Sequence, residues 1–142
     1  AHARAESLGL GVDFHQMNGV DMKFPDNHFD LIVSNNLMHE VSTPNFKMIL
    51  QECHRVLAPG GVLVFQELPI SWRATKQSAI EKALVASRQI ANNEPHFVDC
   101  AQRDTLACAR EAGFAHAQER VVASSTAPWG KWYLLEAKKA VE

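Results

Sequence analysis

A seven-residue polar stretch places an imidazole beside a carboxylate. Residues 34–40 read SNNLMHE, so that His39 and Glu40 follow two asparagines. Histidine titrates near neutral pH and is the side chain most often used as a general base. Glu40 would then orient the imidazole or contact a substrate. The alternative is a surface histidine in a loop. We predict His39 as the catalytic base candidate.

A second short stretch has residue types suited to recognising a ligand. Asn18, Gly19 and Val20 follow a predicted strand. The asparagine amide offers both a donor and an acceptor, and glycine lets a ligand approach the backbone closely. This pair suits the edge of a purine base. The alternative is that Asn-Gly is only a turn dipeptide, which is also common.

Several other kinds of site are excluded or disfavoured by spacing. HEVST (39–43) lacks the second histidine of a zinc HExxH motif, and no nucleophilic triad, phosphate loop or calcium loop is recognisable. The Gly-x-Gly at 9–11 closes a predicted helix and precedes a strand, the reverse of a dinucleotide fingerprint, which disfavours a nicotinamide-dependent dehydrogenase. Cys53 lies on a predicted buried stripe, and Cys100 and Cys108 are predicted to be structural.

Composition narrows the class of protein. The chain has 142 residues and a net charge of −2, which fits one globular domain (1–142) and lacks the basic footprint of a nucleic-acid binder. No apolar run approaches the roughly 20 residues that span a bilayer. Three cysteines without a CxxC spacing predict free thiols in a reducing, cytoplasmic compartment.

The elements that position these residues alternate between strands and helices. Their order predicts an α/β fold with a mostly parallel sheet and a C-terminal antiparallel hairpin. Thr43 can cap a helix with one apolar stripe, and Ile80, Ala83, Leu84, Ser87, Ile90 and Ala91 share one face of a later helix. The remaining expectations are helices over 2–8 and after Asp104, and strands Val12–Met17, Phe29–Asn36, Val62–Glu67, Ala115–Ser124 and Lys131–Lys139.

Ligands of open α/β sheets bind beyond the carboxyl ends of the parallel strands. Three such ends are readable: Asn18 to Val20, Ser34 to Glu40, and Glu67 to Pro69. We therefore expect these three segments to lie on the same side of the sheet.

Three motifs in this order resemble the class I S-adenosylmethionine-dependent methyltransferases that act on small molecules. They are FPDNHFDLIVSNNLMHE (24–40), ECHRVLAPGGVLVF (52–65) and AREAGF (109–114) with the hairpin that follows. The resemblance implies a Rossmann-like sheet, S-adenosyl-L-methionine as cofactor and a small-molecule acceptor.

The resemblance also assigns roles to residues of this chain. Asn18, Gly19 and Val20 match the adenine-binding positions, where the family usually has an acidic residue. Asn35, Asn36 and Leu37 match the loop beside the methionine moiety. His39 matches a loop histidine whose role differs between members, and the segment from Glu67 to Pro69 would face substrate.

The family's first strand, its glycine-rich cofactor loop and its second strand would precede Ala1. We therefore expect a fragment that holds half of the cofactor site. Its Phe29–Asn36 edge would either pair directly with Val12–Met17 or form a homodimer. The alternative function is a non-catalytic α/β interaction module that keeps the methyltransferase fold.

Overall fold

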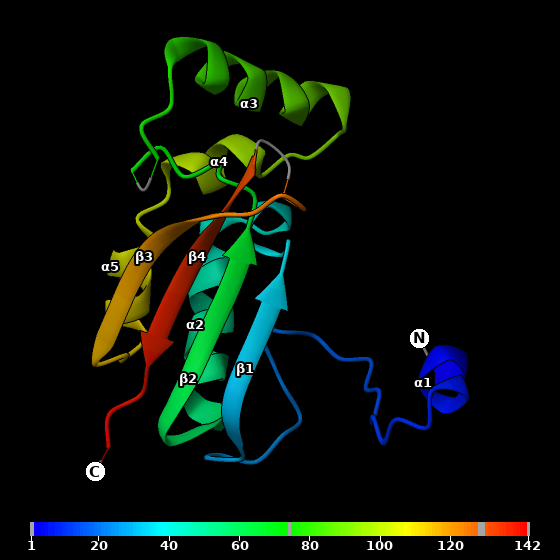
Figure 1. The fold of residues 1–142 in the computed structure, drawn as a ribbon. Helices are drawn as coiled ribbons and strands as arrows, with labels where there is room; N and C mark the ends of the chain where they lie inside the picture. Colours follow the sequence, from blue (N-terminus) through cyan, green and yellow to red (C-terminus); the bar gives the residue numbers. More distant parts are fainter. Residues whose placement is uncertain (1, 74, 128–129, 142) are drawn as a thin grey trace.

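The computed structural model describes residues 2–73, 75–127 and 130–141 (Figure 1). Its strands are β1 (Phe29–Asn35), β2 (Leu57–Glu67), β3 (His116–Ala123) and β4 (Lys131–Lys138). Its helices are α1 (His2–Ser7), α2 (Thr43–Val56), α3 (Ala79–Ala91), α4 (Phe97–Gln102) and α5 (Thr105–Glu111), with a 3₁₀ turn η1 (Met38–Glu40) after β1.

The four strands form one sheet in the order β1-β2-β4-β3. Strands β1 and β2 are parallel, whereas β2–β4 and β3–β4 are antiparallel. The predicted α/β class and C-terminal hairpin are confirmed. The expectation of a mostly parallel sheet is only partly met, because one pair is parallel and two are antiparallel. Residues 128 and 129 of the hairpin connection, including Trp129, lie outside the described residues.

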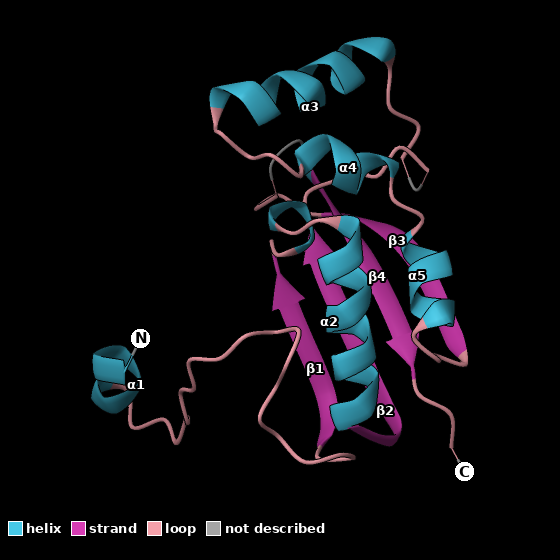
Figure 2. Cartoon of the chain, turned by 180° about the vertical axis from the view of Figure 1, so that it is seen from behind, coloured by secondary structure: helices cyan, strands magenta, loops and turns pink. Residues whose placement is uncertain are grey.

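Helices α2 and α5 cover one face of this sheet (Figure 2). The side chains on that face are the buried ones, among them Leu63, Phe65 and Leu135. Alternate residues point the other way, and on β1 these are Leu31 and Val33, which are 57% and 64% exposed. No helix lies over this second face in Figure 1. The core therefore lies between the sheet and the layer of α2 and α5.

Helix α2 forms where its apolar spacing predicts. Its buried residues Phe46, Ile49, Leu50, Cys53 and Val56 repeat at three and four positions. The N-cap is Ser42, one residue before the predicted Thr43; its hydroxyl accepts from the backbone of Asn45, and Pro44 occupies the first turn.

Strand β2 begins earlier than predicted, at Leu57 instead of Val62. The chain leaves α2 directly into the strand, and Phe29 pairs with Leu57 before a register shift in the ladder. Two glycines make this path possible. Gly60 has a φ of +78°, and a Cβ at Gly61 would come 2.8 Å from the carbonyl oxygen of Ala58.

The predicted strand Val12–Met17 does not form. This segment has no regular structure, and only an isolated bridge joins Asn18 to Asp21. Val12 and Phe14 are exposed, so the segment has neither a neighbouring strand to pair with nor a core to pack against. The expected direct pairing with Phe29–Asn36 is therefore wrong for this structure, and β1 is an edge strand.

Helix α3 forms, with the capping box of Ser78 and Glu81 at its start. The face shared by Ile80, Leu84 and Ile90 is exposed, and the buried residue of the helix is Val85. The helix lies over α4 at the end of the sheet and not against the sheet (Figure 1). Periodicity identified an apolar stripe but carried no information on where the helix would dock.

Candidate functional site

His39 and Glu67 meet at the carboxyl ends of the two parallel strands. His39 lies in η1 just after β1, and Glu67 is the last residue of β2. The imidazole Nδ1 is 2.8 Å from Glu67 Oε1, and both side chains are buried. The N–H of Nδ1 does not point at the carboxylate oxygen as a hydrogen bond requires, so the contact is an ion pair without a hydrogen bond.

Glu67 reaches this position through strand alternation. Leu63, Phe65 and Glu67 lie on the same face of β2, and the first two are core residues. Glu67 Oε1 also accepts from the backbone of Leu68 at 2.7 Å. The sequence analysis named Glu67 as facing substrate but missed it as the partner of His39. The sequence did offer a signal for this pair. A carboxylate on the inward face of a buried strand needs a polar partner, so Glu67 had to meet one.

Three carboxylates set the electrostatics of His39. Burial works against the charged imidazolium, but the contact with Glu67 and the charges of Glu67, Glu40 and Glu94 outweigh it and raise the pKa of His39. Glu40 Oε1 lies 3.2 Å from the imidazole Nε2, and its side chain is 55% exposed. The two ring nitrogens therefore face different partners, one buried and one at the surface.

Arg103 holds the loop that carries His39. Its guanidinium donates to the backbone oxygens of Met38 and Val41 at 3.0 and 2.6 Å, and its Nε donates to the hydroxyl of Thr43. It also contacts Asp99 at 2.9 Å, and it lies 4.6 Å from the centre of the Phe46 ring. Because the Arg103 side chain is fully buried, these contacts stabilise the loop from the protein interior. Its position between two short helices gave no sequence signal.

The predicted cofactor residues after β1 lie at the same end of the sheet as His39. Asn36 has a φ of +55°, and its N–H donates to the backbone oxygen of Gln66. The side-chain oxygen of Asn35 accepts from Gln66 Nε2 at 3.3 Å. Leu37 packs against the core. The left-handed conformation at Asn36 turns the chain out of the strand and into η1.

Asn18, Gly19 and Val20 lie beside α2. The side-chain oxygen of Asn18 accepts a hydrogen bond from Val20 N at 3.2 Å. This bond is typical of a turn, which was the alternative to a ligand-binding role for Asn18 and Gly19. A Cβ at Gly19 would come 3.4 Å from Ile49, so this glycine allows a close approach to the helix. Ile49 is about 9 Å along α2 from Thr43 at the helical rise per residue. No described contact joins this turn to the His39 loop.

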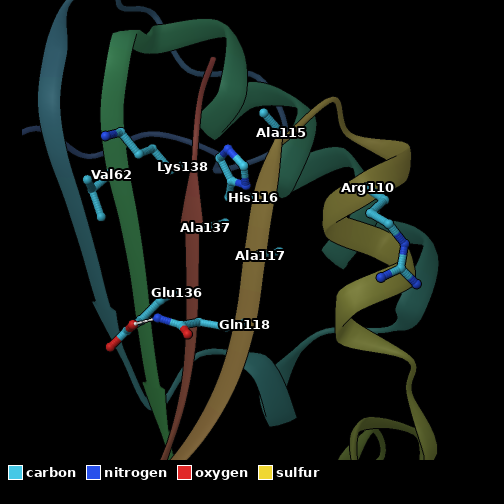
Figure 3. A pocket seen from close by; sticks show the side chains of 9 residues that line it. All are labelled: Val62, Arg110, Ala115, His116, Ala117, Gln118, Glu136, Ala137 and Lys138. Carbon is cyan, nitrogen blue, oxygen red and sulfur yellow. Dashed lines mark hydrogen bonds between the residues drawn. The ribbon is translucent and has the colours of Figure 1, made fainter. Parts of the chain in front are cut away.

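A wide hollow in the described surface lies at the other end of the sheet (Figure 3). Val62 and His116 both pair with Lys138, and all three residues line the hollow. Val62 lies five positions before Glu67, the carboxyl end of β2, so the hollow lies away from that end. The end of the sheet that holds the hollow is not where open α/β sheets bind ligands. Its lining residues are Val62, Arg110, Ala115, His116, Ala117, Gln118, Glu136, Ala137 and Lys138.

A smaller, mostly apolar pocket includes Pro69, which follows Glu67 by two residues. It is lined by Pro69, Gln77, Glu81, Leu84, Val85 and Lys131. This pocket brings α3 and the start of β4 together with the segment that follows β2.

The three cysteines are free and buried, in agreement with their predicted structural role. Burial raises the pKa of the Cys53 and Cys100 thiols to about 12, which suppresses the reactive thiolate. No helix among the described residues is long and apolar enough to cross a membrane.

Comparison with known proteins shows which fold the chain has. A sequence model described as a methyltransferase domain matches residues 1–65. A solved S-adenosylmethionine-dependent methyltransferase from Methanosarcina mazei superposes with a TM-score of 0.67 over 100% of this chain and 76% of its own, at 20% identity. The chain has the Rossmann-like methyltransferase fold. The family model spans the motifs at 24–40 and 52–65, so the resemblance in these two motifs is confirmed.

Two curated methyltransferases are similar to part of the chain. A probable phthiotriol/phenolphthiotriol dimycocerosates methyltransferase 2 of Mycobacterium ulcerans is 33% identical over 86 residues, which is 59% of this chain and 31% of that protein. A demethylmenaquinone methyltransferase of Thermus thermophilus is 36% identical over 69 residues, or 49% of this chain and 30% of that protein. The matches thus span about a third of these relatives' length.

Proposed function

We propose that the chain is part of an S-adenosylmethionine-dependent methyltransferase that acts on a small molecule, with His39 as general base. The observation that carries this proposal is the buried pair of His39 and Glu67 at the carboxyl ends of the parallel strands. The methyltransferase fold and the names of the similar proteins support the reaction class.

The proposal gives each nitrogen of His39 a separate task. Glu67 lies at Nδ1, holds the ring in place and favours a proton on that atom. Nε2 is then the basic atom, and its neighbour Glu40 is exposed enough to swing away when an acceptor binds. His39 takes the proton from the acceptor's hydroxyl or amine as that atom attacks. The bound cofactor supplies a sulfonium methyl group, which the acceptor receives as S-adenosylhomocysteine is released.

The cofactor residues remain the predicted ones: Asn18, Gly19 and Val20 for the adenine, and Asn35 to Leu37 for the methionine moiety. Two features of their backbone support this proposal. Asn36 is turned out of the strand end, and the peptide at Gly19 carries no side chain. The small apolar pocket beside Pro69 is the proposed place for the acceptor, because Pro69 is two residues beyond Glu67 in the segment that leaves β2.

The first experiment is a calorimetric titration of the chain with S-adenosylhomocysteine, carried out with a chelator present. We expect saturable binding, with nicotinamide dinucleotide as a control ligand that does not bind. Asn36→Pro should weaken binding, because proline cannot adopt a positive φ, whereas the matched Asn93→Pro, at the end of α3, should not. A flat trace at millimolar ligand would contradict cofactor binding by this chain.

A second candidate function rests on the bare edge of the sheet. Strand β1 has no partner on its outer side in the described residues, and it exposes Leu31 and Val33. A flat S-adenosylhomocysteine titration together with association through this edge would favour a non-catalytic interaction module.

A further inference from the structure

One carboxylate near His39 has no role in the proposed methyl transfer. Glu94 lies in the loop between α3 and α4, and its Oε2 is buried without a hydrogen-bond partner in the described part of the chain. A buried carboxylate oxygen with no donor is energetically costly. It needs either a donor or a cation.

Glu94 shares its surroundings with two other metal-ligand side chains. One donor atom each from His39, Glu40 and Glu94 lies within 4.8 Å of the other two. His39 Nε2 and Glu40 Oε1 are already 3.2 Å apart. Zinc binds such nitrogen and oxygen donors at about 2.0–2.2 Å, so tetrahedral donors lie roughly 3.4 Å from one another. One pair therefore has metal-site spacing, and the other two pairs of donor atoms lie within 4.8 Å.

The far side of the imidazole faces a second carboxylate. Glu67 Oε1 is 2.8 Å from Nδ1, so that Nε2 is the nitrogen directed at Glu40. A carboxylate behind a ligating histidine fixes the ring and makes the ligating nitrogen more basic. The ring of Phe97 packs against His39 with centroids 5.3 Å apart and restricts it further.

We propose that His39, Glu40 and Glu94 bind one divalent transition-metal ion of the Zn²⁺ class, with water at the fourth position. Mixed imidazole and carboxylate donors select this class over Ca²⁺ or Mg²⁺, which take oxygen ligands. The bound ion occupies Nε2, so it excludes His39 from proton transfer. This last consequence rests on the proposed function, and it makes the ion an inhibitor of methyl transfer.

The test is a calorimetric titration of the chelator-stripped full chain with Zn²⁺, without cofactor or acceptor. We expect one ion per chain. Glu94→Gln keeps the shape of the side chain but weakens a ligand, and should reduce affinity by at least about ten-fold. Glu111→Gln is the matched control, because Glu111 pairs with Lys47 elsewhere on the surface and should bind Zn²⁺ as the unaltered chain does.

Two results would overturn the proposal. One is the absence of saturable Zn²⁺ binding. The other is equal binding by the unaltered chain and Glu94→Gln, which would assign the ion to another of the seven histidines. Circular dichroism of each variant shows whether it is folded, and Glu40→Gln provides a second, exposed ligand change if Glu94→Gln is not.

The outcome is separable from that of the proposed function. Zinc binding is measured without cofactor, and S-adenosylhomocysteine binding is measured with chelator. Zinc binding with a flat S-adenosylhomocysteine trace would keep the metal site and remove the methyltransferase proposal. The reverse pair of results would keep the methyltransferase proposal and remove the metal site.

Discussion

At the scale of single residues, the site is a histidine whose ring is approached by acids on both sides. Glu67 is buried at Nδ1 and Glu40 is exposed at Nε2. The inner carboxylate acts in a low-dielectric environment, where its interaction with an imidazolium is strong, while water screens the outer one. Glu67 therefore decides both the orientation and the proton affinity of His39.

Glu67→Gln should lower the pKa of His39. The change keeps the size of the side chain but removes the charge that favours the imidazolium. The raised pKa also means that His39 stabilises the folded chain at low pH and that this contribution is lost as the pH rises through the folded pKa. The pKa is measured by nuclear magnetic resonance titration of the imidazole with chelator present.

Glu111→Gln serves as the control for this titration and should leave the pKa of His39 unchanged. An unchanged pKa in Glu67→Gln would show that the 2.8 Å contact with Oε1 does not exist in solution.

At the scale of elements, the loop of η1 is tied to α4 by Arg103. The guanidinium satisfies the carbonyls of Met38 and Val41, which the loop would otherwise bury without donors. It is also bonded to Asp99 in α4. The η1 loop and α4 should thus unfold together.

Arg103→Met should destabilise the chain by about 3–5 kcal/mol, because it removes one partner of a buried network and leaves carbonyls unsatisfied.

Burial alone would raise the pKa of Asp99, but hydrogen bonds from Arg103 and Thr43 outweigh it and lower the pKa. The unaltered chain should therefore lose stability as the pH falls through the Asp99 pKa. Urea unfolding at several pH values measures both effects.

Arg120→Met is the matched control, because Arg120 is an exposed strand residue paired with Glu136. It should change stability by less than about 1 kcal/mol. Equal losses in the two variants would contradict a structural role for Arg103.

Helix α3 shows what element-scale reasoning from sequence misses. Its capping box and length follow from local residues and were predictable. Its docking was not, because Val85 rather than the apolar stripe faces the protein. A hydrophobic stripe establishes that a helix is amphipathic, but the position of its neighbours decides which side is covered.

At the scale of the whole molecule, helices cover one face of the sheet and β1 lies at its edge (Figures 1 and 2). Leu31 and Val33 project from β1 on the uncovered face. An apolar edge strand with free backbone groups is a template for pairing with another chain. The proposal of a homodimer through this edge follows from that arrangement.

The chain should associate as its concentration rises, as measured by analytical ultracentrifugation. Val33→Lys should shift it towards the monomer, because a lysine on an edge strand opposes pairing. Val122→Lys on β3, at the opposite edge, is the matched control and should leave the association unchanged. A monomer at every concentration, or equal effects of both variants, would contradict pairing through β1.

The sequence by itself determined the local elements and the kind of fold. The apolar spacing of 46–56 sets the buried face of α2, the glycines at 60 and 61 allow the tight backbone path within β2, and the alternation in 116–138 sets the hairpin. These depend on interactions among residues close in the chain. The motifs around 24–40 and 52–65 identified the methyltransferase fold.

Only the tertiary structure decided which polar groups meet. Glu67 reaches His39, 28 positions earlier, because β1 and β2 are parallel neighbours, and Arg103 reaches the same loop across 65 positions. The segment Val12–Met17 had a strand-like sequence but found no strand to pair with. Such outcomes depend on non-local pairing, in which a residue's partners are set by how distant elements pack and not by the residues beside it.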